Sequence, residues 1–90
     1  MQGHRSRRAV PQTPEDLFGQ VLRDLRKERG FSQEELAFQS GYHPTYIGQL
    51  ERGKKSPSLR AIMRIAHALT TRASELLKRV EALAASGVES

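Results

Sequence analysis

The chain contains no cysteine, which excludes disulfide bonds, cysteine-ligated zinc and thiol chemistry. No apolar run approaches the ~20 residues that a membrane-spanning helix needs, so we expect no membrane partner. The N-terminus carries arginines but lacks the apolar stretch of a signal peptide. A cytoplasmic protein is therefore the expectation.

The sequence also lacks the clustered side chains that catalysis or metal binding requires. The histidines His4, His43 and His67 are scattered and form no HExxH pattern. Neither a glycine-rich phosphate loop nor a nucleophile–base pair stands out. We therefore expect no enzyme, no metal and no cofactor. His43 precedes an expected helix, where a turn residue is the simplest interpretation.

Positive charge is in excess, with a formal net charge of +5. Such a balance favours polyanionic partners, nucleic acid above all. The charge is concentrated in two places. One group is Arg5, Arg7 and Arg8 near the N-terminus. The other is Arg52, Lys54, Lys55, Arg60 and Arg64.

Apolar residues recur at helical spacing, and no segment alternates apolar and polar residues as a strand does. Thr13 followed by Pro14 predicts the start of a first helix. Ser32 and Glu35 form a capping box that predicts the start of a second. The expected helices run from Pro14 to just before Gly30, from Gln33 to about Ser40, and over about 44–52, 58–69 and 73–84.

These elements predict a single all-α domain of five helices over residues 13–85. Residues 1–12 lack apolar periodicity and are expected to form a flexible basic arm. We expect this arm either to follow a DNA groove or to act only as a solubilising tail. Residues 86–90 are expected to fray. The core side of the fourth helix is expected to be Leu59, Ile62, Met63, Ala66 and Leu69.

Residues 33–52 form a unit of two short helices and a turn. Ala37 is small where the two helices must cross closely, and Gly41 lies at the turn, where a left-handed backbone costs glycine least. The apolar contacts that fix the angle between the helices are expected from Leu36, Ile47 and Leu50. This arrangement is a helix-turn-helix, whose second helix lies in the major groove of DNA.

The run FSQEELAFQSGYHPTYIGQLERGKKSPSLRAIMRIAHAL, residues 31–69, resembles the DNA-binding domains of phage repressors and Cro proteins. This is the xenobiotic-response-element-type family. The resemblance covers about residues 15–83. It implies a lambda-repressor-like fold and a transcription regulator that binds double-stranded DNA. The segment TYI before ERGK is most similar to the controller proteins of restriction–modification systems.

The second helix of the motif, the recognition helix, opens with Pro44 and has Gly48 in its middle. A mid-helix glycine costs roughly 1 kcal/mol relative to alanine. We expect Gly48 to let the helix seat deeply against base edges or sugars; a position without function is the alternative. The resemblance implies base contacts from the face formed by Pro44, Thr45, Gly48 and Gln49.

Gln49 can bind adenine through two hydrogen bonds, and Thr45 can contact a base or a thymine methyl. Proline lacks a side-chain donor where the family often has a long polar residue, so one base contact is expected to be lost at Pro44. Tyr46 is expected either to contact the DNA backbone or to be a partly buried ring.

Phosphate contacts are expected on both sides of this face. Gln33 matches a family position that binds a phosphate and braces the recognition helix; an ordinary exposed residue is the alternative. Past the helix, the residues that we expect to neutralise phosphates beside the groove are Arg52, Lys54, Lys55 and Ser56.

The resemblance also implies two contacts that do not touch DNA. Glu51 is expected to form a structural ion pair with Arg26 of the first helix. The last helix carries an apolar stripe that is wide for one small core, and part of it is expected to form a homodimer interface. That stripe is Leu76, Leu77, Val80 and Leu83.

A symmetric dimer would bind a palindromic operator. The alternative function is an antitoxin-type or other protein-binding module, which holds a partner protein and also binds its own promoter.

Overall fold

The computed structural model describes residues 12–89, and for 87–89 the backbone alone. This part of the chain forms helices and no strand, which confirms the predicted all-α class. The helices are α2 (Pro14–Glu28), α3 (Gln33–Ser40), α4 (Pro44–Glu51), α5 (Leu59–Ala68) and α6 (Ala73–Glu89). The arginines of the expected N-terminal arm lie outside the described residues.

Local capping sets the first two helix starts, as predicted. Thr13 Oγ1 accepts a hydrogen bond from the Asp16 N–H at 3.0 Å, and the Asp16 carboxylate accepts one from the Thr13 N–H. Ser32 and Glu35 make the same reciprocal pair at 3.0 and 2.7 Å. Gly41 ends α3 in the left-handed conformation with φ 81°. These short-range bonds satisfy amide groups that helix ends leave unpaired.

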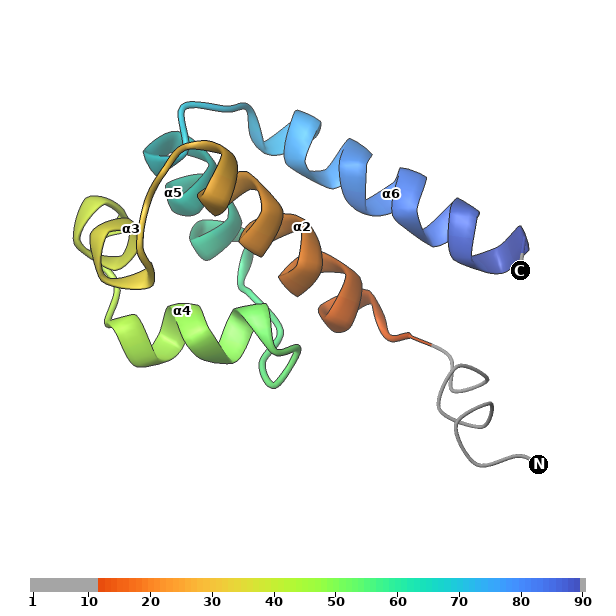
Figure 1. Ribbon diagram of the computed structural model, residues 1–90, viewed down its shortest axis with the longest axis horizontal. Coiled ribbons are helices and arrows are strands. Elements are labelled where there is room, and N and C mark those ends of the chain that lie inside the picture. Colours follow the sequence, from red (N-terminus) through yellow and green to blue (C-terminus); the bar gives the residue numbers. More distant parts are fainter. Residues whose placement is uncertain (1–11, 90) are drawn as a thin grey trace.

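Helix α2 lies between α4 on one side and α6 on the other (Figure 1). α3 packs on both α4 and α5, which closes the remaining side of the bundle. The largest fully buried side chains are Leu22, Leu36, Ile47, Leu50, Ile65, Leu69 and Leu76. Among the described helices, none has the length and apolar character to cross a membrane. The core thus leaves α4 and α6 on opposite sides of α2.

Gly19 allows α2 and α4 to approach each other closely. A Cβ atom at this position would lie 2.6 Å from the carbonyl oxygen of Glu51 and would also overlap the carbonyl oxygen of Leu50. Both obstacles are backbone atoms, so neither can rotate away. The sequence alone does not distinguish this glycine, because the backbone that it meets belongs to a segment about thirty residues later.

Two expectations about the later helices are wrong. On α5, Leu59 and Met63 were expected in the core but are 74% and 55% exposed, and Ala61 and Ile65 are buried instead. Apolar residues occur almost all around α5, so spacing alone cannot select the buried face. α6 continues to Glu89, beyond the expected end at residue 84 and through most of the segment expected to fray.

Candidate nucleic-acid interface

The helix-turn-helix consists of α3, a turn over residues 41–43, and α4. The backbone N–H groups of Gly41 and Tyr42 both donate to the carbonyl of Ala37 at 2.9 Å. His43 caps α4, since its Nδ1 accepts a hydrogen bond from the Thr45 N–H at 3.1 Å. His43 is therefore a turn and cap residue, as its simplest interpretation predicted.

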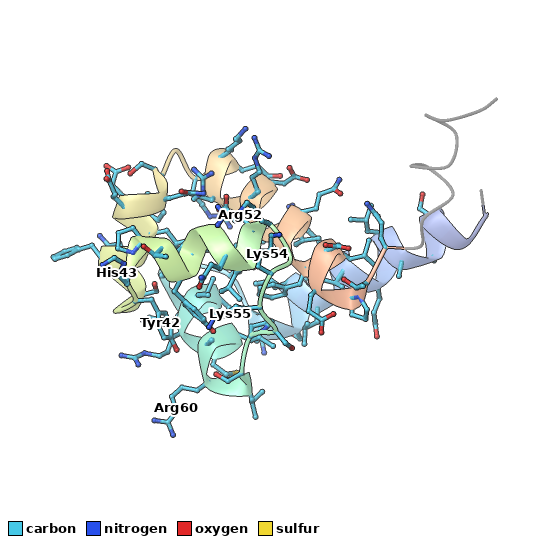
Figure 2. All side chains as sticks on the ribbon, turned by 90° about the horizontal axis from the view of Figure 1, so that it is seen from below. Tyr42, His43, Arg52, Lys54, Lys55 and Arg60 are labelled. Carbon is cyan, nitrogen blue, oxygen red and sulfur yellow. The ribbon has the colours of Figure 1, made fainter. Side chains whose placement is uncertain are left out.

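α4 is anchored on one side and open on the other. Ile47 and Leu50 are fully buried in the core. Thr45 is exposed and Gln49 is half-buried on the other side of the helix. Figure 2 shows α4 lying across the front of the molecule with Arg52 at its C-terminal end. The open face is short, polar and flanked by positive charge.

A buried ion pair holds the end of α4. Arg26 Nε donates to Glu51 Oε2 at 2.6 Å, and Arg26 Nη2 donates to Oε1 at 3.1 Å. Gln33 Nε2 donates to the same Oε1 at 2.9 Å. Thus the ion pair that the resemblance implied is present, and Gln33 braces α4 through Glu51. One carboxylate ties α4 to both α2 and α3.

The surroundings of Gly48 differ from the expectation. A Cβ atom on Gly48 would lie 3.2 Å from Nη1 of Arg52 and 3.7 Å from Oε1 of Gln33. The space beside this glycine is therefore taken by two side chains of the protein itself. Because these side chains cover the glycine, deep seating of a bare backbone against DNA is not what the structure supports.

Tyr46 is a half-buried ring that packs against the core. Its ring centroid lies 5.0 Å from that of Tyr42, with the planes tilted by 44°. Burial raises the pKa of the Tyr46 hydroxyl, and Tyr42 adds to the rise, while the backbone of Ser58 acts in the opposite direction. Of the two roles expected for Tyr46, the structure supports the partly buried ring.

The loop after α4 carries exposed basic side chains. It turns at Gly53, whose φ is 72°, and the Lys54 N–H donates to the Gln49 carbonyl at 2.9 Å. The exposed residues here are Arg52, Lys54, Lys55 and Ser56. Figure 2 shows the basic residues of this group near the C-terminal part of α4, with Arg60 projecting from α5. The open face of α4 therefore has a basic border.

The apolar stripe of α6 divides into core and surface residues. Leu76 is fully buried within a single chain, so its place in the expected dimer interface is corrected to a core position. Val80 and Leu83 are half-buried and pack on the core, and Leu77 is 39% exposed. Only Leu77 and the open edges of Val80 and Leu83 are left for a partner.

A family model described as Helix-turn-helix matches residues 22–76 of the chain. This chain belongs to the helix-turn-helix family. The predicted family is confirmed, and with it a DNA-binding transcription regulator rather than a family of enzymes. The match spans α3 and α4 and most of the elements that hold them.

Relatives and solved structures support the same assignment. The chain is 44% identical over 62 residues to control protein C.BamHI of Bacillus amyloliquefaciens, covering 68% of this chain and 76% of that protein. The crystal structure of the restriction–modification controller protein C.AhdI from Aeromonas hydrophila is 47% identical, with a TM-score of 0.68, and covers 69% of this chain and 94% of its own. The predicted similarity to controller proteins is thus confirmed.

A further solved structure extends the fold match along the chain. The clp gene regulator ClgR from Corynebacterium glutamicum is 28% identical with a TM-score of 0.83, and it covers 89% of this chain and 85% of its own. The arrangement of helices described here is therefore similar to that of a clp gene regulator over most of both chains.

Proposed function

We propose that this regulator binds a palindromic operator as a homodimer and controls transcription of neighbouring genes. The observation that carries the proposal is the open polar face of α4, whose opposite side is locked by the core and by the Arg26–Glu51–Gln33 network. A rigid helix with one polar face and a basic border has the features needed to enter a major groove.

The roles of the side chains follow from their chemistry. Gln49 offers both a donor and an acceptor, which match the edge of adenine, and Thr45 offers a hydroxyl and a methyl group. Lys54, Lys55 and Ser56, exposed in the loop after α4, are the proposed phosphate contacts. The amide group of Gln33 has a second hydrogen that is not used by Glu51, and this hydrogen can be donated to a phosphate oxygen.

The proposed dimer uses the outer side of α6. Leu77 is the large apolar side chain that this helix leaves most open, next to Val80 and Leu83. Because α2 separates α6 from α4, pairing through α6 leaves the face of α4 open (Figure 1). Two copies would then present their recognition helices ~34 Å apart, one turn of DNA.

The specific role that we propose is control of a restriction–modification system. Its support is the similarity to the control protein C.BamHI and to the controller protein C.AhdI. Adjacent genes for a nuclease and a methyltransferase would agree with this role. A neighbouring small toxin that co-purifies with the chain would favour the antitoxin-type alternative instead.

Selection of bound sites from a random DNA pool tests the DNA-binding proposal and yields the operator. The double variant Thr45→Ala/Gln49→Ala should lose operator preference in a gel-shift experiment while it keeps the helical circular-dichroism signal. If the double variant still prefers the same operator, the assignment of the reading face is wrong.

Sedimentation at micromolar concentration tests the dimer. Leu77→Glu should shift the protein towards monomer, because a charge would be buried at the proposed interface. Lys78→Glu, an exposed change on the same helix, is the matched control and should leave the dimer intact. Monomers alone, both in solution and on DNA, would rule the dimer out.

A further inference from the structure

We propose that Arg52 determines specificity by reading a guanine in the major groove, and that Gly48 is a positioning residue that makes room for its guanidinium. This assignment rests on the proposed function of α4 as the helix that enters the groove. It differs from the expectation that Arg52 only flanks the groove and neutralises a phosphate.

Helical geometry places Arg52 on the reading face. Arg52 follows Gly48 by four residues and Thr45 by seven, so the three positions share one side of the helix. Side chains on a helix lean towards its N-terminus, over the preceding turn. The structure shows this lean, because Nη1 of Arg52 lies 3.2 Å from where a Cβ of Gly48 would stand. The guanidinium therefore covers the middle of α4 rather than the loop beyond it.

Gln33 lies against the same spot and limits where the guanidinium can go. Its Oε1 and Nε2 would be 3.7 and 3.9 Å from that Cβ position, and its Nε2 is fixed by the bond to Glu51. Gln33 and Arg52 thus approach Gly48 together. A glycine at position 48 leaves room for both side chains at this spot.

The donors of Arg52 are available to a ligand. Within the described part of the chain, the ion pairs are Arg26–Glu51 and Arg79–Glu28, so Arg52 makes none with a carboxylate. The neighbouring carboxylate of Glu51 is already occupied by Arg26 and Gln33. Arg52 itself is exposed.

Guanine is the base that matches this group. A guanidinium can donate two parallel hydrogen bonds to O6 and N7 of guanine, which is the commonest specific contact in the major groove. Arg52 also supplies a charged donor to a face on which Pro44 has none. We therefore expect a G·C pair in each half-site, read by Arg52 at the C-terminal end of α4, next to the position read by Gln49.

Binding to single-base variants of the selected operator tests this assignment. Arg52→Ala should abolish discrimination at one G·C pair per half-site, a loss of about 5- to 150-fold, and leave preferences elsewhere in the site unchanged. Arg52→Lys keeps the charge but loses the planar fork, so it should weaken the same preference while keeping the salt dependence. Lys55→Ala is the control for a phosphate contact and should weaken all sequences alike, with the salt slope reduced by roughly 1.

Gly48→Ala tests the positioning role without removing the arginine. The added methyl group meets the mobile end of Arg52, so the fold should persist while discrimination at the same G·C pair falls. Unchanged discrimination in Gly48→Ala would overturn the positioning role of Gly48. If Gly48→Ala does not fold, Arg52→Lys still tests guanine reading.

The outcomes separate this assignment from the proposed function. If Arg52→Ala weakens every operator variant equally and lowers the salt slope, Arg52 is a phosphate contact and guanine reading is wrong, while operator binding stands. If the unmodified protein shows no sequence preference in the selection, the proposed function fails first.

Discussion

Arg26 of α2 and Glu51 of α4, 25 positions apart in the sequence, form a two-point ion pair with Nε–Oε2 and Nη2–Oε1 distances of 2.6 and 3.1 Å. Their side chains are only 11% and 4% exposed. The third guanidine nitrogen, Nη1, donates to the Phe31 carbonyl, and Gln33 adds a third bond to the carboxylate. The pair is therefore satisfied on both sides, which a charge held away from water requires.

Removal of either partner should destabilise the protein strongly. Glu51→Ala leaves the Arg26 guanidinium buried without a counter-charge, and we expect a loss of about 3–5 kcal/mol in the free energy of unfolding. Urea unfolding followed by circular dichroism measures this change. Arg79→Ala, which breaks the exposed pair with Glu28, should have a far smaller effect. Equal effects of the two variants would show that the Arg26–Glu51 pair does not hold α4.

The double variant Arg26→Met/Glu51→Leu separates desolvation from packing. It removes both charges and fills the site with apolar side chains. It should therefore lower the free energy of unfolding less than Glu51→Ala alone does. Because Gln33 would lose its carboxylate partner, operator affinity should still fall in the double variant. If the double variant were less stable than Glu51→Ala, the loss of stability would come from disturbed packing between the helices rather than from an unpaired buried charge.

Alanine at two mid-helix glycines should have opposite effects on stability. At Gly19 the methyl group would overlap the backbone carbonyls of Leu50 and Glu51, and we expect a loss of about 1–3 kcal/mol from overpacking. At Gly48 the nearest obstacle is the flexible end of Arg52, so the higher helix propensity of alanine should dominate, with a gain of up to about 1 kcal/mol. Thermal unfolding of both variants gives the comparison. A more stable Gly19→Ala protein would contradict the close approach of α2 and α4.

The helix ends could be predicted from sequence because they depend on nearby residues. The side chains of Thr13 and Ser32 each accept a hydrogen bond from the amide three residues ahead. Gly41 adopts a left-handed backbone conformation that a residue with a Cβ would adopt at a cost. The helix-turn-helix could also be recognised from sequence. The small residue, the glycine and the apolar residues that define it contact one another within a short segment of α3 and α4. Local chemistry was sufficient for these features.

Features that depend on distant contacts could not be predicted in the same way. The buried face of α5 was misassigned, because Leu59 and Met63 are as apolar as the buried Ile65 and only packing selects among them. Sequence alone does not distinguish the roles of Gly19 and Gly48. Gly19 faces the backbone of a segment far away in the sequence, whereas Gly48 faces the side chain of a residue four positions later.

Tyr46 should give stability a dependence on alkaline pH. Burial raises the pKa of its hydroxyl in the folded state above the ordinary value of 10.0. The folded state therefore holds this proton more tightly than the unfolded state. The resulting stabilisation is complete below pH 10 and is lost as the pH rises through the folded-state pKa.

Tyrosinate absorbance during an alkaline titration measures this shift. It should show a component that ionises late, and this component should vanish in Tyr46→Phe. The same component in the variant would assign the shift to another group.

Thr70 is a residue whose replacement should stabilise the protein. It follows α5 with φ 57°, a left-handed conformation that is costly for a β-branched side chain. The Thr70 and Thr71 N–H groups donate to the carbonyls of His67 and Ala66, the bond pattern of a helix end that usually places glycine at this position. Thr70→Gly removes the clash of Cβ and keeps both backbone bonds, so we expect a gain of about 1 kcal/mol.

Thr70→Ala is the matched variant, because it shortens the side chain but retains Cβ. It should therefore gain much less than Thr70→Gly in urea unfolding. Thr70→Asn should fall between the two, since asparagine adopts the left-handed conformation more readily than other residues with a Cβ. If alanine stabilised the protein as much as glycine, the side chain of Thr70 rather than its backbone conformation would be the cause. Because Thr70 is exposed, any of these changes should leave the core intact, so operator binding should be unchanged across the series.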